Sequence, residues 1–445
     1  MSAAASRPDA ERYDAAVARL FARRPERMVP GLERIAALCG RLGQPQRAAA
    51  VVHLTGTNGK TSLARMIASL LEAHRLRTGT YTSPHLQDVR ERVRIGDRPI
   101  SREAMLAALA ALDAPIAAVE ADRGEMVTFF ETLTALAYRQ FAVEAVDTAV
   151  VEVGMGGRWD ATNVADADVA VLNPVRLDHA ELGSTVAEVA GEKAGIITAG
   201  APAVLASQDE VAARILHAEA RRVGAPLLVA ERDFGLARRE PAPEGQRLDL
   251  RAPRGAVDGA WLPLLGAHQA ANAAVALAAV DALLERRGLP FDADAARAGL
   301  AAVRSPGRLE VVEPADGGPT VVLDGAHNPA GAAALAEALG SDVAAGRRVL
   351  VVGAMGDKDC AGILDALLPA VDDVVATEAP TGRSAPAERL AKLCRLAGRE
   401  ARAEGDLPAA LAAARSSAGP DDVVVVTGSL YLVGAARDAL GLPVA

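Results

Sequence analysis

The sequence predicts an α/β protein in two parts: a large domain on a mostly parallel sheet with a small antiparallel patch, followed by a smaller α/β domain. Short β-branched runs alternate with longer Ala- and Leu-rich amphipathic runs, a pattern typical of a parallel sheet with helices on both faces. At 445 residues, the chain is also too long for one core. We expect the ligand site in the cleft between the two domains.

Composition excludes several classes of protein. No stretch reaches the roughly 18 uncharged apolar residues of a membrane helix, and Met1–Asp9 lacks the apolar block of a signal peptide. Three cysteines cannot form a disulfide framework, and a net charge of −9 argues against a nucleic-acid surface. We expect a soluble cytoplasmic protein without membrane or nucleic-acid partners, in which local cationic side chains and metal ions hold any anionic ligand.

The first domain is predicted to span residues 1–303. Two amphipathic helices, Asp9–Arg23 and Gly31–Leu42, precede its first strand. The β-branched runs predict strands at Ala50–Leu54, Gly79–Thr82, Thr148–Val153, Val169–Asn173 and Ala203–Ala206. The amphipathic runs predict helices at Thr61–His74, Ser101–Ala121, Thr128–Ala142, Thr185–Ile196 and Asp209–Val223.

Residues 233–265 consist of short alternating pieces separated by Pro and Gly. They predict either a small antiparallel patch or a plain surface excursion, before a helix at 267–286. A Pro-Gly turn predicts a hinge at 304–308, after which a second α/β domain spans 309–445. Its predicted strands are Leu309–Val312, Thr320–Leu323, Arg348–Val352, Asp373–Ala376 and Val423–Thr427.

A Gly-rich loop joins the first strand to the next helix. Its residues are Gly56, Thr57, Asn58, Gly59, Lys60, Thr61 and Ser62. Backbone N–H groups and the helix N-terminus can cradle phosphate there, with Lys60 on the β- and γ-phosphates and the Thr61 hydroxyl on Mg²⁺. Leu54 stands where the common P-loop spacing has glycine, so the alternative is a turn that only caps a helix. The strand–loop–helix context favours nucleotide binding.

Two more strand ends carry polar side chains at the same rim of the predicted sheet. Glu152 ends one strand, where a carboxylate can serve Mg²⁺ directly or through a neighbour, although a salt-bridged strand end is the alternative. His179 follows another strand, but a lone histidine is more often structural or exposed. Lys193 by itself reads as a solvated lysine on a helix face.

The second domain repeats this arrangement. Asp324 and His327 follow the strand 320–323, and Lys358 follows the strand 348–352. Arg308 places an always-charged guanidinium on the hinge, suited to a phosphate or carboxylate. Each residue is also compatible with ordinary turn chemistry, but their common position at one sheet edge favours a site that faces the cleft.

Taken in order, these segments resemble the Mur ligase superfamily and, within it, the dihydrofolate synthase/folylpolyglutamate synthase family. The resemblance covers nearly the whole chain, and its most specific parts are Thr55–Ser62 and Glu152–Asn163. It extends through Tyr81–Leu86 with Glu91-Arg92, Leu177–His179, Glu192–Ile196, Gly266–Gln269 with Asn272, Pro306–Arg308, Leu323–Pro329 and Gly428–Tyr431. One departure is Gly-Lys-Thr-Ser at 59–62, where many folate-type members have Gly-Lys-Gly-Ser; the cell-wall ligases are closer there.

The resemblance implies a monomeric enzyme that joins L-glutamate to the carboxylate of dihydropteroate, of a reduced folate, or of both. ATP is the co-substrate and an acyl phosphate the intermediate. The implied catalytic residues are Lys60, Lys193, His179 and His327, with Lys193 carried as a carbamate. Thr61, Glu152 and His179 are the implied ligands of two Mg²⁺ sites, and K⁺ is a further candidate ion.

The remaining implied residues surround the substrates. Asn272, Arg308, Asp324 and Lys358 join the Gly-rich loop as ATP-binding residues. On the folate side, Ser83, Pro84 and His85 match the pterin-side loop, and Phe129 and Phe130 are either stacking partners or ordinary core residues. Ser429 and Tyr431 are implied to border the glutamate.

Two other functions stay open at this point. A cell-wall ligase that extends a UDP-linked precursor carries a nucleotide-sugar domain ahead of the Gly-rich loop, whereas here only 55 residues precede Gly56, and they read as helix. A P-loop regulatory or binding protein without ligase chemistry would not need the Asp324–Pro329 constellation. We therefore expect the folate-type ligase.

Overall fold

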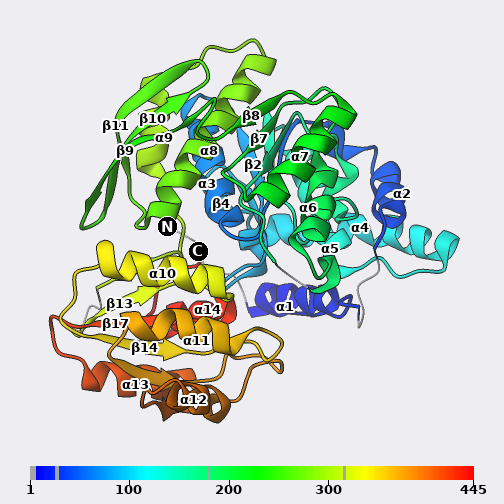
Figure 1. Cartoon of the computed structure of the whole chain (residues 1–445). Coiled ribbons are helices and arrows are strands. Elements are labelled where there is room, and N and C mark those ends of the chain that lie inside the picture. Colours follow the sequence, from blue (N-terminus) through cyan, green and yellow to red (C-terminus); the bar gives the residue numbers. More distant parts are fainter. Residues whose placement is uncertain (1–6, 26–29, 178–179, 314–316) are drawn as a thin grey trace.

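A computed structural model of the chain describes residues 7–25, 30–177, 180–313 and 317–445. Figure 1 shows a larger lobe, coloured blue to green, stacked on a smaller lobe in yellow to red. Each lobe contains its own central sheet. The predicted α/β class with two sheet-bearing parts is therefore confirmed.

The large sheet has eight strands in the order β4-β3-β2-β5-β1-β6-β7-β8. Strands β2, β5, β1, β6, β7 and β8 run parallel, and the β3–β4 hairpin is antiparallel to β2. Their bounds are β1 Ala50–Thr55, β2 Thr78–Tyr81, β3 Val93–Ile95, β4 Arg98–Pro99, β5 Thr148–Glu152, β6 Val169–Leu172, β7 Ala203–Leu205 and β8 Leu227–Val229. All five predicted strands are present, whereas β3, β4 and β8 are not predicted from the sequence.

Helices cover both faces of this sheet. One face carries α1 (Arg7–Phe21), α2 (Glu33–Arg41), α4 (Arg102–Arg123) and α5 (Phe129–Val143), with α6 (Val186–Lys193) and α7 (Glu210–Val223) over β6 and β7. The opposite face carries α3 (Lys60–Ala73), α8 (Ala267–Arg286) and α9 (Ala293–Ala302). Capping boxes begin α5 and α6, in which Thr128 pairs with Glu131 and Thr185 with Glu188, so both helices start where the sequence predicts.

Residues 235–262 form a separate antiparallel sheet of β9 (Gly235–Ala242), β10 (Gly245–Ala252) and β11 (Gly255–Leu262). The antiparallel interpretation of this segment is therefore confirmed, and the surface-excursion alternative is wrong. Leu248, Leu250 and Val257 of this sheet are fully buried in the same core as α8. Helix α8 thus lies between two sheets, which fixes its N-terminal end above the Gly-rich loop.

The second lobe has six strands in the order β12-β13-β17-β14-β15-β16. They are β12 Glu310–Val312, β13 Thr320–Leu323, β14 Arg348–Val352, β15 Asp373–Ala376, β16 Arg402–Ala403 and β17 Val423–Thr427, all parallel except β12. Helices α10 (Pro329–Ser341), α11 (Cys360–Leu367) and α12 (Ala387–Leu396) pack on one face. Helices α13 (Leu407–Ser417) and α14 (Leu430–Ala439) pack on the other.

Two helices, α4 and α8, are long and apolar enough to pass a length-and-hydropathy test for a membrane span. Neither is free of charge, since Asp113 interrupts α4 and Asp281 lies within α8. Helix α8 is a core helix with 83% of its apolar window buried, whereas the corresponding window of α4 is 28% buried.

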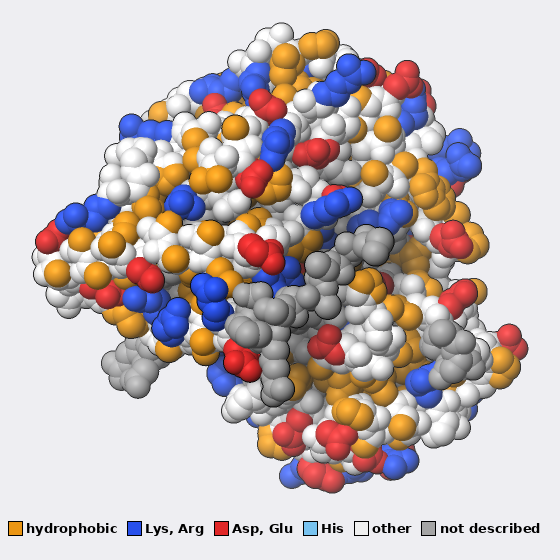
Figure 2. Space-filling model, turned by 180° about the vertical axis from the view of Figure 1, so that it is seen from behind, with side chains coloured by type: hydrophobic (Ala, Val, Ile, Leu, Met, Phe, Trp, Pro, Cys, Tyr) orange, Lys and Arg blue, Asp and Glu red, His pale blue; other side chains and the backbone are white. Residues whose placement is uncertain are grey.

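On the face seen in Figure 2, Lys and Arg side chains are interspersed with Asp, Glu and apolar ones.

The predicted hinge at 304–308 is held on both sides by hydrogen bonds. The Ser305 hydroxyl lies 3.0 Å from that of Ser62 at the start of α3, and the Gly325 N–H donates to the Gly307 carbonyl at 2.9 Å. Further from the linker, Arg239 of β9 forms an ion pair with Asp342, at the C-terminal end of α10. The two lobes are therefore joined by polar contacts on either side of the chain connection. The boundaries 1–303 and 309–445 stay a prediction.

Close backbone packing also joins the lobes at Gly434 of α14. A Cβ atom there would lie 2.1 Å from the Leu86 carbonyl oxygen, a backbone atom of the large lobe. We predict that Gly434→Ala lowers the thermal midpoint, because relieving this overlap costs about 1–3 kcal/mol. Gly340→Ala in α10 is the matched control, since nothing lies within 4 Å of its Cβ position, and should gain about 0.5–1 kcal/mol. Differential scanning calorimetry of both variants tests this; equal shifts would contradict it.

Candidate active site

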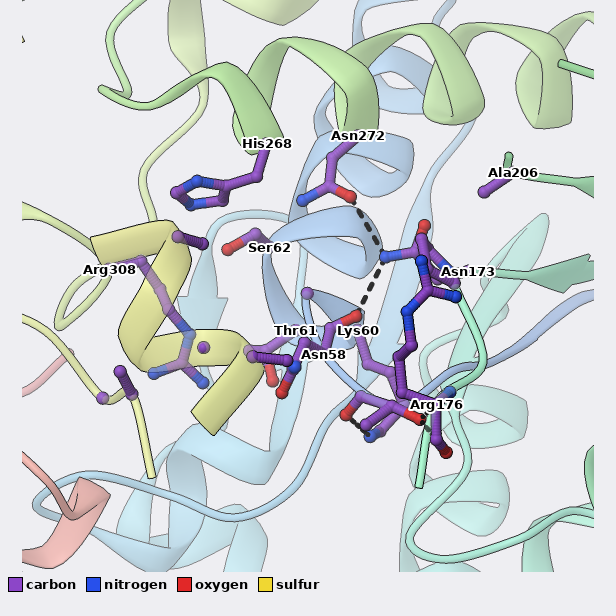
Figure 3. A pocket seen from close by; sticks show the side chains of 18 of the residues that line it. Asn58, Lys60, Thr61, Ser62, Asn173, Arg176, Ala206, His268, Asn272 and Arg308 are labelled. Atoms are coloured by element: carbon purple, nitrogen blue, oxygen red, sulfur yellow. Dashed lines mark hydrogen bonds between the residues drawn. The ribbon is translucent and has the colours of Figure 1, made fainter. Parts of the chain in front are cut away.

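Strand ends from both lobes face a single cavity of about 590 Å³. From the large sheet come the loops after β1, β5, β6 and β7, together with the N-terminal turns of α8. From the small sheet come the loops after β13, β14 and β17. Figure 3 shows this arrangement, with His268 and Asn272 pointing down from α8 toward Lys60, Thr61 and Arg308. The cavity lies where the ligand site is predicted, because both parallel sheets present their carboxyl ends to the space between the lobes.

The Gly-rich loop is shaped by two glycines with positive φ. Gly56 has φ 155° and Gly59 φ 79°, and a Cβ at either would approach Asn173 to within 2.8 Å. The loop ends at the first residue of α3, so the helix N-terminus points into the cavity. The Lys60 ammonium donates to the carbonyls of Gly56 and Thr57, at 3.0 and 3.2 Å. This geometry suits a phosphate group, with Lys60 beside it.

Glu152 lies at the end of β5 with 1% of its surface exposed. Its carboxylate accepts hydrogen bonds from the Thr61 hydroxyl, at 3.0 and 3.2 Å, and from the Ser83 N–H at 3.2 Å. Burial raises the pKa of Glu152, while Lys60 opposes that rise. The carboxylate and the Thr61 hydroxyl therefore face the cavity side by side, which makes a donor set of two hard oxygens.

Lys193, at the end of α6, is 1% exposed and is not a solvated surface lysine. Its amine donates to the Gly56 carbonyl at 3.0 Å, and Lys60 donates to the same oxygen. The first interpretation of Lys193 is therefore wrong, because α6 packs its last turn against the back of the loop. Two amines within reach of one carbonyl repel each other unless anions or a change of charge compensate them.

His179 lies outside the described residues, so its predicted position stays a prediction. Among the residues that are described, no group of three or more His, Cys, Asp or Glu side chains converges as a metal centre. Mg²⁺, however, is usually held by only one or two carboxylates together with substrate phosphates and water. Glu152 with Thr61 fits that requirement.

The linker and the second lobe contribute two opposite charges and a histidine. Burial raises the pKa of the Asp324 carboxyl, and the Arg308 charge opposes that rise. Desolvation lowers the pKa of the half-buried Arg308 guanidinium, and the Asp324 charge opposes that fall. Asp324 also accepts the N–H groups of Leu309 and Ala326, both at 2.8 Å. His327 bonds the Gly325 carbonyl through Nδ1 at 2.8 Å, and burial lowers its pKa to about 4. The imidazole is therefore neutral at pH 7.

Most other predicted residues also line the cavity. These are Asn58, Ser62, Asn272 and Lys358 among the ATP-binding set, Ser83 and Pro84 on the folate side, and Ser429 and Tyr431 on the glutamate side. Ser429 is also the N-cap of α14, where its hydroxyl accepts the Tyr431 N–H at 3.2 Å.

His85, Phe129 and Phe130 are not among the residues that line the cavity. Phe129 stacks on Phe21 with ring centroids 5.2 Å apart, and Arg92 lies 5.3 Å from its ring. Arg92 also donates through Nε to His85 Nδ1 at 2.9 Å. Burial, aided by Arg92, lowers the pKa of His85 to about 3.

The Phe130 ring occupies the space beside Gly154, where a Cβ would meet it at 2.5 Å. Core packing thus accounts for both phenylalanines, and their stacking role stays a prediction. The loop that carries Ser83 and His85 is held by Glu91, whose carboxylate accepts three successive N–H groups, those of Leu86, Gln87 and Asp88, at 2.7–2.9 Å.

Sequence reasoning missed several residues that line the cavity, among them Asn173, Arg176, His268 and Arg383. The scarcity of lysine in the sequence points to other residues that line the cavity. The chain has 44 arginines and only four lysines, and three of those lysines, Lys60, Lys193 and Lys358, line this cavity. Among the described lining residues, six cationic side chains stand against three carboxylates, Glu152, Glu231 and Asp324. The cavity is thus cationic in a protein with a net charge of −9.

A buried network behind the loop involves His53 of β1. Its Nε2 lies 2.8 Å from the Thr162 hydroxyl, and Asp160 accepts that hydroxyl and the backbone N–H groups of Thr162 and Met155. The network connects the strand before the Gly-rich loop to the loop after β5. Complete burial lowers the pKa of His53 to about 3.

Comparison with known proteins identifies two family patterns in the chain. The one described as "Mur ligase middle domain" matches residues 54–280, and the one described as "Mur ligase, glutamate ligase domain" matches residues 307–430. Among curated proteins, the dihydrofolate synthase/folylpolyglutamate synthase of Mycobacterium tuberculosis is 43% identical over 93% of this chain and 91% of its own length. The folylpolyglutamate synthase of Lacticaseibacillus casei is 37% identical over 92% of this chain and 94% of its own length.

Solved structures agree with these sequence relatives. The folylpolyglutamate synthase of M. tuberculosis in complex with ADP and AMPPCP matches with a TM-score of 0.92 at 42% identity, covering 98% of this chain and all of that one. E. coli FolC in complex with DHPP and ADP matches with a TM-score of 0.85 at 31% identity, covering 96% of this chain and 97% of that one.

We predict that His53 makes unfolding depend on pH below neutrality. Its pKa is about 6.5 when unfolded and about 3 when folded, so between these values only the unfolded chain binds the proton. Stability is therefore lost as pH falls from about 6.5 toward 3, by about 1.4 kcal/mol per pH unit from this residue. His53→Gln should reduce the pH slope of the urea unfolding midpoint by about one proton. Above pH 7 the two slopes should agree; an unchanged slope at pH 4–6 would contradict the prediction.

Proposed function

Because the chain belongs to the Mur ligases and, within them, to the dihydrofolate synthase/folylpolyglutamate synthase family, we propose that it is an ATP-dependent ligase that adds L-glutamate to dihydropteroate, to reduced folylpolyglutamates, or to both. The observation that carries the proposal is the single cationic cavity into which the Gly-rich loop and the second lobe's strand ends both open. All three substrates are anionic, so a cavity with excess positive charge suits them together.

The proposed reaction has two steps, formation of an acyl phosphate and then of an amide. A carboxylate oxygen of the pterin substrate attacks the γ-phosphorus of ATP, the bond to the β-phosphate oxygen breaks, and ADP leaves. The amino group of glutamate then attacks the carbonyl of the acyl phosphate, loses a proton and expels phosphate, which forms the amide. Both steps bring anions together, so Lys60, Arg308 and Lys358 act by neutralising charge and holding the reactants in line. The neutral imidazole of His327 can accept a hydrogen bond or a proton at the second lobe's side.

Glu152 and Thr61 are the residues that would hold Mg²⁺ here, with His179 as the further predicted ligand. Held there, the ion would supply neutralisation of the phosphates' negative charge. Burial raises the pKa of Glu152, and the cationic neighbours Lys60 and Arg308 lower it, which keeps this carboxylate suited to a metal.

Lys193 is proposed to carry a carbamate. A neutral amine adds to CO₂ with loss of one proton, which turns a cation into a carboxylate-like anion beside the Gly56 carbonyl. The crowding of Lys60 and Lys193 on one oxygen supports the change, since it removes one of two like charges. A carbamate resonance in the ¹³C NMR spectrum after addition of ¹³C-bicarbonate, absent in Lys193→Ala, tests it.

The acceptor is proposed to enter along Ser83 and Pro84, which line the cavity next to Glu152. His85, Phe129 and Arg92 lie beyond them as a closely packed aromatic and cationic cluster, which would support this loop when a flat heterocycle binds. Glutamate is proposed to lie against Ser429 and Tyr431, which line the cavity from the small lobe.

One test of the proposed function concerns substrate choice. With ATP and glutamate saturating, dihydropteroate or tetrahydrofolate should support ADP release, whereas a UDP-muramoyl precursor should not. Coupled ADP detection with mass spectrometry of the products measures this. Nucleotide turnover that is equal with and without glutamate would overturn the ligase function, and turnover only with the UDP precursor would make the chain a cell-wall ligase.

Another test of the proposed function concerns the phosphate and metal residues. Lys60→Ala and Glu152→Ala should each reduce glutamate-dependent ADP release by at least about a hundredfold, because each removes a charge that is needed in the transition state. Lys392→Ala and Glu388→Ala remove the same charges from the exposed surface of α12 and should retain activity. Circular dichroism should show all four variants folded. Activity near that of the unmodified enzyme in either site variant would mean that the assignment is wrong.

A further inference from the structure

Two carboxamides join the Gly-rich loop to the second lobe. Asn58 Nδ2 donates to Asn328 Oδ1 at 3.2 Å, and Asn328 Nδ2 donates to Asn58 Oδ1 at 2.9 Å. The two side chains thus form a reciprocal pair between residues 270 positions apart in the sequence. Asn58 is part of the loop that would hold phosphate, and Asn328 lies next to His327 at the start of α10.

Asn58 is held from the other side by the large lobe. Asn173 Nδ2 donates to the Asn58 carbonyl and to Asn272 Oδ1, both at 3.0 Å, as the dashed lines in Figure 3 show. Asn272 donates to Gln269 Oε1 at 3.2 Å, and Gln269 donates to the Ser62 hydroxyl at 3.3 Å. The Ser62 hydroxyl in turn lies 3.0 Å from that of Ser305 in the predicted hinge.

These contacts form one chain of neutral groups that runs from the second lobe to the linker. It begins at Asn328, passes Asn58 in the middle of the Gly-rich loop and Ser62 at its end, and reaches the linker at Ser305. Four of its members, Asn173, Asn272, Gln269 and Ser62, are at most 6% exposed. Buried hydrogen bonds of this kind are costly to leave unmade, so the chain resists a change in either lobe's position relative to the loop.

We propose that Asn328 is a positioning residue for the nucleotide: its amide pair with Asn58 sets the Gly-rich loop relative to the second lobe, so that both act on the same triphosphate. The inference rests on the proposed nucleotide site. A carboxamide pair suits this position because it fixes geometry with two hydrogen bonds while it adds no charge beside the phosphates. The amide pair would give Asn328 a role besides that of N-cap, in which its Oδ1 accepts the Gly331 N–H at 2.8 Å.

The N-cap bond and the amide pair can be separated by substitution. Serine at 328 retains a hydroxyl able to cap α10 but cannot reach across to form the two amide bonds. Asn58→Ser removes the same pair from the loop side. Asp406→Ala is the control for the loss of a helix cap alone, because Asp406 caps α13 through the Ala409 N–H and does not line the cavity.

The test is a double-mutant cycle in the full-length protein, read by calorimetric titration with ADP and by glutamate-dependent ADP release. Because each substitution removes the amide pair, Asn328→Ser and Asn58→Ser should each weaken ADP binding by about fivefold to tenfold. The double variant should be no weaker than the weaker single variant, and Asp406→Ala should bind ADP as the unmodified protein does.

The positioning role is overturned if Asn328→Ser binds ADP within twofold of the unmodified protein, or if the two single effects multiply in the double variant. A fall in thermal midpoint without a change in ADP affinity would also overturn it, since that leaves only the N-cap. Failure of the proposed ligase function is a separate result. It would appear as ADP release that does not depend on glutamate in the unmodified protein, whatever the cycle shows for ADP binding.

Discussion

The repulsion between anions is the constraint on which this structure depends. A protein with a net charge of −9 offers little attraction to a triphosphate or to a dicarboxylate amino acid, so the positive charge must be concentrated where these ligands meet. The cavity does this with six cationic side chains drawn from both lobes and the linker between them. Neither lobe alone supplies the set, because Lys60 and Lys193 belong to the large lobe and Arg308, Lys358 and Arg383 to the linker or the small one.

Parallel sheets solve the geometric side of the same problem. Every parallel strand delivers its carboxyl end to one edge, and short loops there can place single polar residues without disturbing the core. In the large sheet, adjacent strands β5 and β1 end in Glu152 and the Gly-rich loop; in the small sheet, adjacent strands β13 and β17 end in Asp324 and Ser429. The two sheet edges face each other. The strands therefore determine where the cavity lies, and the residues that follow them supply most of its polar side chains.

The sequence predicted the strands well because their residues are buried on both faces, so each reads as an unbroken run such as Val423–Thr427. Glu152 ends such a run and Asp324 directly follows one, and both line the cavity, as does Lys60 at the start of the helix after β1. The sequence prediction failed where position depends on tertiary packing. Lys193 reads as a surface lysine because nothing local shows that α6 turns it toward Gly56. Asn173 and Arg383 belong to no distinctive motif, and their place in the cavity is decided by neighbouring chain segments.

The distribution of lysine and arginine connects composition to chemistry. Arginine serves this chain as a structural cation, because its planar fork can bond two partners at once; Arg34 bridges Glu131 and Glu125, and Arg254 bonds the Asp281 carboxylate. Lysine is a compact point charge with a titratable amine, which can move within a phosphate loop and can react as a nucleophile. This chain uses arginine 44 times and lysine four times, yet three of the four lysines line one cavity, where a compact and titratable amine suits chemistry on phosphates.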